Sequence, residues 1–219
     1  MKCLLLAFTL LLPLHISAEE ITTKNLTMSV TARIEYDTNG QVLHSEIIDN
    51  LGLKPTFIEL IQTSLSHKHF EPHKVDGNPV RFLTGVRLEL SITSDNNSMD
   101  VEIKDYEIFP LTKKSFYLPT PRSLVFISSK SPIRVSCIVG VDGSCTSIDV
   151  DVPVGIPRSD AIKYTKSMFS QWKFEPQQVN GIPVEGLRIL TFKFNSKDLP
   201  TFENIRLPRI DQSMHKFPP

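Results

Sequence analysis

Apolar and polar residues alternate along the start of this chain in a pattern that predicts a β-hairpin. The first alternating run begins near residue 28. Its apolar positions are Val30, Ala32, Ile34 and Tyr36. A period of two places one face of a strand against a core and the other against solvent. The turn Asp37–Gly40 follows, where glycine suits a positive φ, and residues 41–48 are predicted to return as the second strand.

The pattern then changes to the period of a helix. Thr56, with Glu59 three residues later, is a capping-box pattern that predicts a helix start. One face of this helix is apolar, at Phe57, Leu60, Ile61 and Leu65. Alternation resumes over residues 86–92 and predicts a third strand. The first unit is therefore a hairpin, a helix and a strand.

The same order of elements recurs later in the chain. Residues 70–80 read FEPHKVDGNPV, and residues 174–184, which lie 104 residues on (174 − 70), read FEPQQVNGIPV. The shared residues include Phe70, Pro72, Gly77, Pro79 and Val80 in the first segment and Phe174, Pro176, Gly181, Pro183 and Val184 in the second. Strands are predicted at 133–139 and 144–152, followed by a helix with Ser159 as its N-cap and a last strand near 190–194. A repeat of this length predicts two copies of one domain.

The composition and the two ends of the chain indicate where the domains begin and end. Residues 1–18 resemble a cleavable signal peptide, because the apolar run is about a dozen residues, shorter than the about 20 that a membrane-spanning helix needs. We expect domains at 19–93 and 118–196, a linker at 94–117 and a flexible tail at 197–219. Their cores are expected to be separate, or their sheets to join edge to edge. The 24 basic residues balance the 24 acidic ones, which disfavours nucleic acid as a partner.

Two cysteines remain once residues 1–18 are removed. Cys137 and Cys145 lie in the second hairpin, and an exported protein that keeps two such cysteines favours a disulfide. A two-residue loop at 142–143 would place the two cysteines on opposite faces, where they cannot bond. A three-residue loop at 141–143 pairs Val139 with Cys145 and leaves Cys137 opposite Ser147. The cysteines are then diagonal neighbours about 7–8 Å apart. A disulfide needs about 4.4–6.8 Å, so a further bulge or a strong twist must bring them together. The alternative is two buried thiols.

Candidate chemistry is sparse. His67, His69 and His73 form the one cluster of metal-ligand type, but the second copy has Gln171, Lys173 and Gln177 at these positions. A solvated histidine-rich surface is therefore favoured over a metal site. Zinc-type cysteine clusters, phosphate-binding glycine loops and nucleophile elbows are absent from the sequence. We expect a protein that is not an enzyme and has neither a cofactor nor a small-molecule substrate.

Trp172, Phe174 and Pro176, followed by the run Asn180–Val184, resemble the TonB C-terminal domain family. The first copy carries Lys68 where the second has Trp172. The resemblance implies an α+β fold with two tandem small domains, each a three-stranded antiparallel sheet with one helix packed on it. It also implies contact with extended segments of other envelope proteins, outer-membrane receptors among them, although the repeated motif residues themselves are expected to be scaffold.

Two functions are consistent with this resemblance. The first is a periplasmic, non-catalytic binding module whose sheet edges pair with extended segments of partner proteins. The alternative is a TonB-type energy transducer for outer-membrane transport, in which residues 1–18 stay as an anchor. The chain departs from TonB in having two domains and in lacking a long proline-rich spacer, which favours the binding module.

Overall fold

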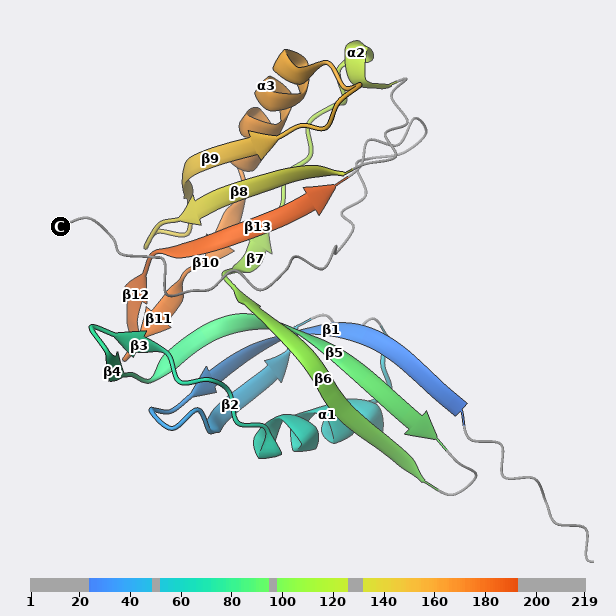
Figure 1. The fold of residues 1–219 in the computed structure, drawn as a ribbon, viewed down its shortest axis with the longest axis vertical. Coiled ribbons are helices and arrows are strands. Elements are labelled where there is room, and N and C mark those ends of the chain that lie inside the picture. Colours follow the sequence, from blue (N-terminus) through green and yellow to red (C-terminus); the bar gives the residue numbers. More distant parts are fainter. Residues whose placement is uncertain (1–23, 49–51, 95–97, 126–131, 193–219) are drawn as a thin grey trace, which may run out of the picture.

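The computed structural model describes residues 24–48, 52–94, 98–125 and 132–192. The predicted signal peptide at 1–18 and the predicted tail at 197–219 lie outside these residues. The described chain is mostly β, with 53% of residues in strands and 18% helical. Figure 1 shows the two larger sheets, one above the other, each with a helix packed on it.

The first copy builds the larger sheet. Strand β1 (Lys24–Tyr36) pairs antiparallel with β2 (Val42–Ile47) on one side and with β5 (Phe82–Ser94) on the other. Strand β6 (Met99–Phe109) pairs with the outer side of β5. Helix α1 (Pro55–His67) lies against this sheet and buries Ile61 and Leu65.

The second copy follows the same order on a smaller scale. Its sheet has the strand order β13-β8-β9, formed by β8 (Ile133–Val139), β9 (Cys145–Asp151) and β13 (Gly186–Phe192). Helix α3 (Arg158–Phe169) packs on this sheet, and the short helix α2 (Arg122–Val125) precedes β8.

Short strands connect and extend the two copies. Strand β7 (Leu111–Lys114) pairs with β10 (Lys173–Glu175). The repeated segments form two small hairpins, β3 (Lys74–Val75) with β4 (Asn78–Pro79), and β11 (Gln177–Val179) with β12 (Ile182–Val184). The β11–β12 hairpin joins the large sheet beside β5.

The prediction of two small three-stranded α+β domains is therefore wrong. The described residues form a large curled sheet of five to six strands and include three helices. The weakly alternating residues 99–109 form a full strand, because they pair with β5 along ten positions from Gly85 to Ser94. The hairpin of the second copy also adds to this sheet. The stretch 94–117, predicted as a linker, contains β6 and β7.

Both predicted helix caps are wrong as well. Helix α1 begins at Pro55, one residue before Thr56, and Lys54 at its N-cap makes no side-chain capping bond. Proline at the first helical position presets φ and needs no hydrogen-bonded N–H there, so the helix starts without a side-chain cap. Helix α3 begins at Arg158, with Pro157 rather than Ser159 at the N-cap.

The repeat is visible in matching turn contacts. In the first copy the Phe70 N–H donates to the Gly40 carbonyl at 2.8 Å, and in the second the Phe174 N–H donates to the Gly143 carbonyl at 2.8 Å. Both glycines have positive φ, 83° and 76°. A Cβ on either would lie about 2 Å from the carbonyl oxygen of the partner phenylalanine, at 1.9 Å for Gly40 and 2.1 Å for Gly143.

The second pair of turns also matches. Asp76 and Gly77 have φ of 50° and 80°, and Asn180 and Gly181 have φ of 50° and 81°. The two turns therefore share one conformation with positive φ, as a repeat of one structural unit requires. Aspartate and asparagine tolerate this left-handed region better than most residues, which explains their place before the glycine.

The Cys137–Cys145 disulfide is present, with 5.6 Å between the Cα atoms. Val139 pairs with Cys145, but Ile138 pairs with Ser147, so Thr146 is left unpaired in a bulge. The bulge moves Cys137 opposite Ile148 and brings the cysteines within bonding distance, as the loop geometry required. The first hairpin has the same bulge, because Tyr36 pairs with Val42 while Glu35 pairs with His44. The bulge therefore belongs to the scaffold, and the disulfide uses it.

We expect Gly143→Ala to destabilise the protein more than Gly181→Ala. Both positions have positive φ, so alanine at either costs about 1–2 kcal/mol of backbone strain. Gly181 has no atom within 4 Å of an added Cβ, whereas Gly143 faces the Phe174 carbonyl oxygen at 2.1 Å. The backbone must shift to relieve that overlap, which should add about 1–3 kcal/mol. Urea unfolding of the two variants tests this, and equal losses would contradict it.

We expect loss of the disulfide to lower the free energy of unfolding by about 2.5 kcal/mol on the chain-entropy estimate. The double variant Cys137→Ala/Cys145→Ala should therefore unfold at lower urea, with the first-copy core unchanged. Mass analysis of unreduced, alkylated wild-type protein supplies the covalent control. Uptake of the alkylating agent by both thiols without prior reduction would show that the bond does not form.

Candidate functional site: the seam between the copies and the open sheet edges

The two copies meet along a seam in which strands of the second copy pair with strands of the first part of the chain. Gln178 pairs with Leu83 and Val179 with Phe82, so β11 lies beside the start of β5. The Asn180 N–H donates to the Arg81 carbonyl at 2.9 Å, and the Arg81 N–H donates to the Asn180 side-chain oxygen at 3.2 Å. At the seam, β11 is therefore added to the large sheet as a further strand beside β5. Asn180 extends this pairing by one residue, with its backbone N–H and its side-chain oxygen both bound to Arg81.

Side chains reinforce this backbone pairing. Glu175 makes an ion pair with Arg33, which also contacts Glu46 at 2.8 Å. These opposite charges raise the pKa of Arg33, with the hydrogen bond to Glu175 as the largest cause. The Gln177 amide donates to the Thr84 hydroxyl at 2.7 Å. The seam therefore has polar contacts that fix its register.

Two arginines, Arg87 and Arg188, lie over the ring of Phe109 at the seam. The guanidinium carbon of Arg188 lies 3.7 Å from the centroid of the Phe109 ring, and that of Arg87 lies 5.4 Å away. Arg87 also pairs with Glu107 at 2.8 Å. Burial, together with the positive charge of Arg87, lowers the pKa of Arg188 to about 9. The Nε and Nη1 of Arg188 have no hydrogen-bond partner among the described residues.

The outer strands of the two sheets offer open edges. In the described part of the chain β2 pairs with β1 alone, and β9 pairs with β8 alone. An edge strand presents backbone N–H and C=O groups that another chain can pair with. The two edges occupy equivalent positions in the two copies, since β2 and β9 are both the second strand of their hairpin.

The β9 edge is polar and rigidly held. Its exposed residues are Thr146, Ser147, Asp149 and Asp151. The disulfide ties the first residue of the strand to β8, and Val150 anchors the other end in the core. In β2 the carboxylate of Glu46 is already bound to Arg33. Asp149 pairs instead with Ser136, which carries no charge.

The family-motif residues are placed as scaffold. Phe70, Trp172 and Phe174 are each at most 3% exposed, and the Trp172 indole N–H donates to the Phe116 carbonyl at 2.7 Å. Pro79 and Pro183 lie in β4 and β12, next to the turn glycines Gly77 and Gly181. The remaining motif residues lie beside these, Pro72 and Pro176 before the hairpins and Val80 and Val184 at their ends. The buried rings hold the hairpins in place.

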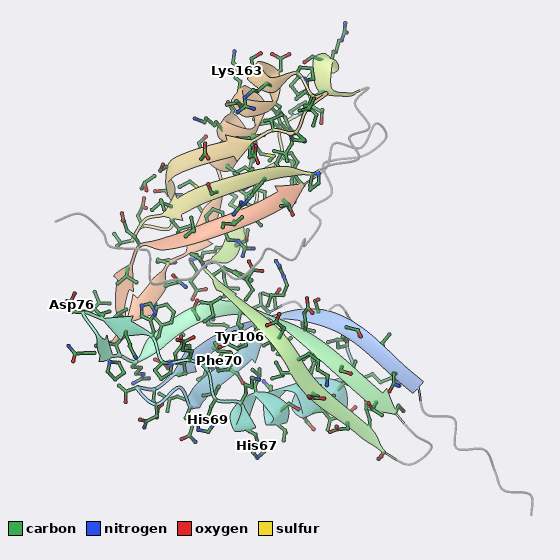
Figure 2. All side chains as sticks on the ribbon, viewed as in Figure 1. His67, His69, Phe70, Asp76, Tyr106 and Lys163 are labelled. Carbon is green, nitrogen blue, oxygen red and sulfur yellow. A yellow bond between two sulfur atoms is a disulfide. The ribbon has the colours of Figure 1, made fainter. Side chains whose placement is uncertain are left out.

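The three histidines are not brought together. The described residues contain no group of three or more His, Cys, Asp or Glu side chains that could hold a metal ion. His67 Nδ1 lies 2.8 Å from the Thr63 carbonyl at the end of α1, and His69 makes a bridge to Gln41 (Figure 2). His73 stacks on Phe82, with 3.9 Å between ring centroids, and burial lowers its pKa.

The functional contacts that sequence reasoning missed are those of the seam. Arg87 and Arg188 lie in strands whose residues are largely buried. A charged residue within such a strand is the one feature of the sequence that could have pointed to the seam. Arg188 even lies on the core side of β13, with Leu190 and Phe192. A long cation at a core position is typical of a contact with another unit.

Comparisons with known protein families, with curated proteins and with solved structures gave no match. Within the residues that the structure describes, none of the helices is long and apolar enough to cross a membrane. The seam and the open edges therefore carry the functional argument by themselves.

We expect His73→Gln to make the protein less sensitive to acid. The folded state lowers the pKa of His73 below its ordinary 6.5, so the unfolded chain binds the proton more readily and stability falls as pH drops below that value. Glutamine, which the second copy has at this position, does not titrate. The loss of unfolding free energy between pH about 7.5 and about 5 should be smaller in the variant than in the wild type. The same loss in both would contradict this expectation, and His69→Gln is the exposed control.

Proposed function

We propose that this protein is a non-catalytic binding module of the cell envelope that pairs its open sheet edges with extended segments of partner proteins. The observation that carries the proposal is the seam. This chain already adds a strand from one copy to the sheet of the other, through Gln178 and Val179. Strand addition of this kind supplies affinity through backbone hydrogen bonds and specificity through alternate side chains.

The β9 edge is the better of the two open edges for this role. The disulfide holds β9 against β8, so less conformational entropy is lost when a partner strand binds. Its polar side chains keep the edge soluble when it is empty, as edge strands require. Asp149 and Asp151 favour a partner segment with basic side chains, because opposite charges across a strand pair attract.

Two features of the sequence support the proposal, the signal-peptide-like segment at residues 1–18 and the resemblance to the TonB C-terminal domain. An export signal at residues 1–18 and a disulfide are both expected of a protein in an oxidising compartment. The resemblance to the TonB C-terminal domain points in the same direction, since that family contacts extended segments of outer-membrane receptors. A binding module has no need of the mechanical link that a transducer requires.

We expect a photo-crosslinking residue at Ser147 in β9 to capture partner proteins in living cells. A residue at His44, the equivalent position in β2, tests the second edge, and Lys163 on the exposed face of α3 is the matched control (Figure 2). Crosslinked products should be strongest from Ser147 and weak from Lys163. Mass spectrometry of the captured peptides should show extended segments rich in lysine or arginine.

Equal capture from Ser147 and Lys163 would overturn the edge proposal. Capture confined to His44 would reassign the site to β2. A double variant Asp149→Asn/Asp151→Asn separates the charge argument from the strand pairing. It should weaken capture at Ser147 without abolishing it, because the backbone groups of the edge remain.

A further inference from the structure

The open edge of β2 presents apolar and charged side chains together. Leu43 is 52% exposed, and Ile48, the residue after the strand, is 42% exposed. His44 and Glu46 lie between them and are also exposed. Proline and lysine, which blunt many edge strands, are absent from β2. The β2 edge is therefore suited to pairing with a further strand.

The hydrogen bonds to β1 show which backbone groups of β2 face the open edge. The Ile48 N–H donates to the Thr31 carbonyl at 2.9 Å, so the pair that Ile47 makes with β1 is of the non-hydrogen-bonded type. The two types alternate along an antiparallel ladder, so the pair that Ser45 makes is of the same type. The N–H and C=O groups of Ser45 and Ile47 therefore point away from β1, where another strand could bind them.

The stretch that can accept a strand has a defined start. The bulge of β2 falls at Leu43, and Gln41 before it already bridges to His69. In the described chain the open edge therefore covers residues 43–47. His44 and Glu46 pair with exposed or half-exposed residues of β1, so they lie on the face of the sheet that points away from the core.

We infer that β2 pairs antiparallel with β2 of a second copy of this chain, about a two-fold axis at Ser45. The two Ser45 residues then exchange hydrogen bonds through the groups that face the edge. His44 of each molecule lies opposite Glu46 of the other. The inference rests on strand addition at an open edge, as the proposed function does, and it names the partner of β2 alone.

The charges favour this register over its neighbours. Within one molecule Glu35 pairs with His44, and Arg33 pairs with Glu46. Across the four strands of the joined sheet, each row then reads glutamate, histidine, glutamate, arginine from one molecule to the next. Every acid has a basic group beside it, and such cross-strand pairs attract. Moving the axis by one residue would place Glu46 opposite Glu46, or His44 opposite His44, and would lose this alternation.

The same register covers the exposed apolar residues at the two ends of the edge. Leu43 of each molecule comes within one position of Ile48 of the other, and both are exposed in the single molecule. Because the same surface serves both partners, the contact is isologous and closes as a dimer. A ladder over residues 43–47 is short, so the dimer belongs to the weak or transient class.

The equivalent edge of the second copy is not complementary to itself. At the offset of 103 residues between the hairpins (143 − 40), Thr146 corresponds to Leu43 and Ser147 to His44. Two β9 strands in the same register would place Asp149 opposite Ser147, which carries no charge to attract it. The dimer contact therefore uses β2 and leaves β9 open for the partners of the proposed function.

Sedimentation of the purified, oxidised protein from about 1 μM to about 500 μM measures the association. We expect a monomer–dimer equilibrium without larger species. His44→Glu should weaken it at least about tenfold, because the two-fold axis places like charges opposite each other twice. His44→Lys should tighten it about two- to tenfold, because lysine is charged at neutral pH whereas most histidine is not. Ser147→Glu adds the same charge to β9 and, as the matched control, should leave the association unchanged.

Disulfide trapping tests the register. His44→Cys chains mixed with Glu46→Cys chains should form a mixed disulfide, because these positions lie directly opposite each other. The matched pair on the other edge, Ser147→Cys with Asp149→Cys, should stay unlinked. A protein that remains monomeric over the whole concentration range would overturn the inference. So would equal effects of His44→Glu and Ser147→Glu, or trapping mainly of His44→Cys with itself.

Failure of this inference is distinguishable from failure of the proposed function. The dimer is measured with purified protein, whereas the partners of β9 are captured at Ser147 in living cells. A monomer that still captures partners at Ser147 would overturn the dimer and leave the proposed function in place. A dimer without capture at Ser147 would do the reverse.

Discussion

The contact on which both copies depend is the approach of a hairpin glycine to the phenylalanine that follows the helix. Gly40 accepts a hydrogen bond from Phe70, and Gly143 accepts one from Phe174, each at 2.8 Å. The space for a side chain is absent, because a Cβ at either glycine would overlap a phenylalanine carbonyl. This bond closes the loop between the first hairpin and the end of the helix. It also buries the ring, since Phe70 and Phe174 are both 2% exposed.

The elements that follow the phenylalanine are the same in both copies. The proline and the small hairpin come next in both copies, and the last strand starts a few residues later. In the second copy this geometry carries β11 onto the start of β5, where Glu175 meets Arg33. In the first copy β3–β4 pairs with no other strand of the described chain. The same local structure therefore gives an internal joint in one copy and an exposed hairpin in the other.

Local features could be predicted from the sequence, whereas the joining of the two copies was one of two open alternatives and its contacts could not be predicted. Alternation at Val30 to Tyr36 placed β1, and the turn glycines marked both hairpins. The disulfide was predicted from the expected export and from the two remaining cysteines, and the hairpin geometry added that a bulge or a strong twist was needed. Residues 99–109 alternate weakly because a register shift at Lys104 moves the core-facing positions from Val101 and Ile103 to Tyr106 and Ile108. Their pairing with β5 is a tertiary effect. The predicted start of α1 was wrong because the helix begins at a proline and has no side-chain cap.

Arg188 indicates that the seam fixes the orientation of the second copy more than it stabilises the folded protein. A guanidinium whose pKa falls to about 9 through burial, with two nitrogens lacking partners in the described chain, raises the free energy of the folded state. Its stacking on Phe109 recovers part of that, about 1–2 kcal/mol for a desolvated cation over an aromatic ring. An apolar residue would pack there at lower cost but would accept many arrangements of β13 against β6. The arginine accepts few, because its planar group must lie over one ring and stay apart from Arg87. The seam thus holds the second copy in one orientation, and with it the direction in which the open β9 edge faces.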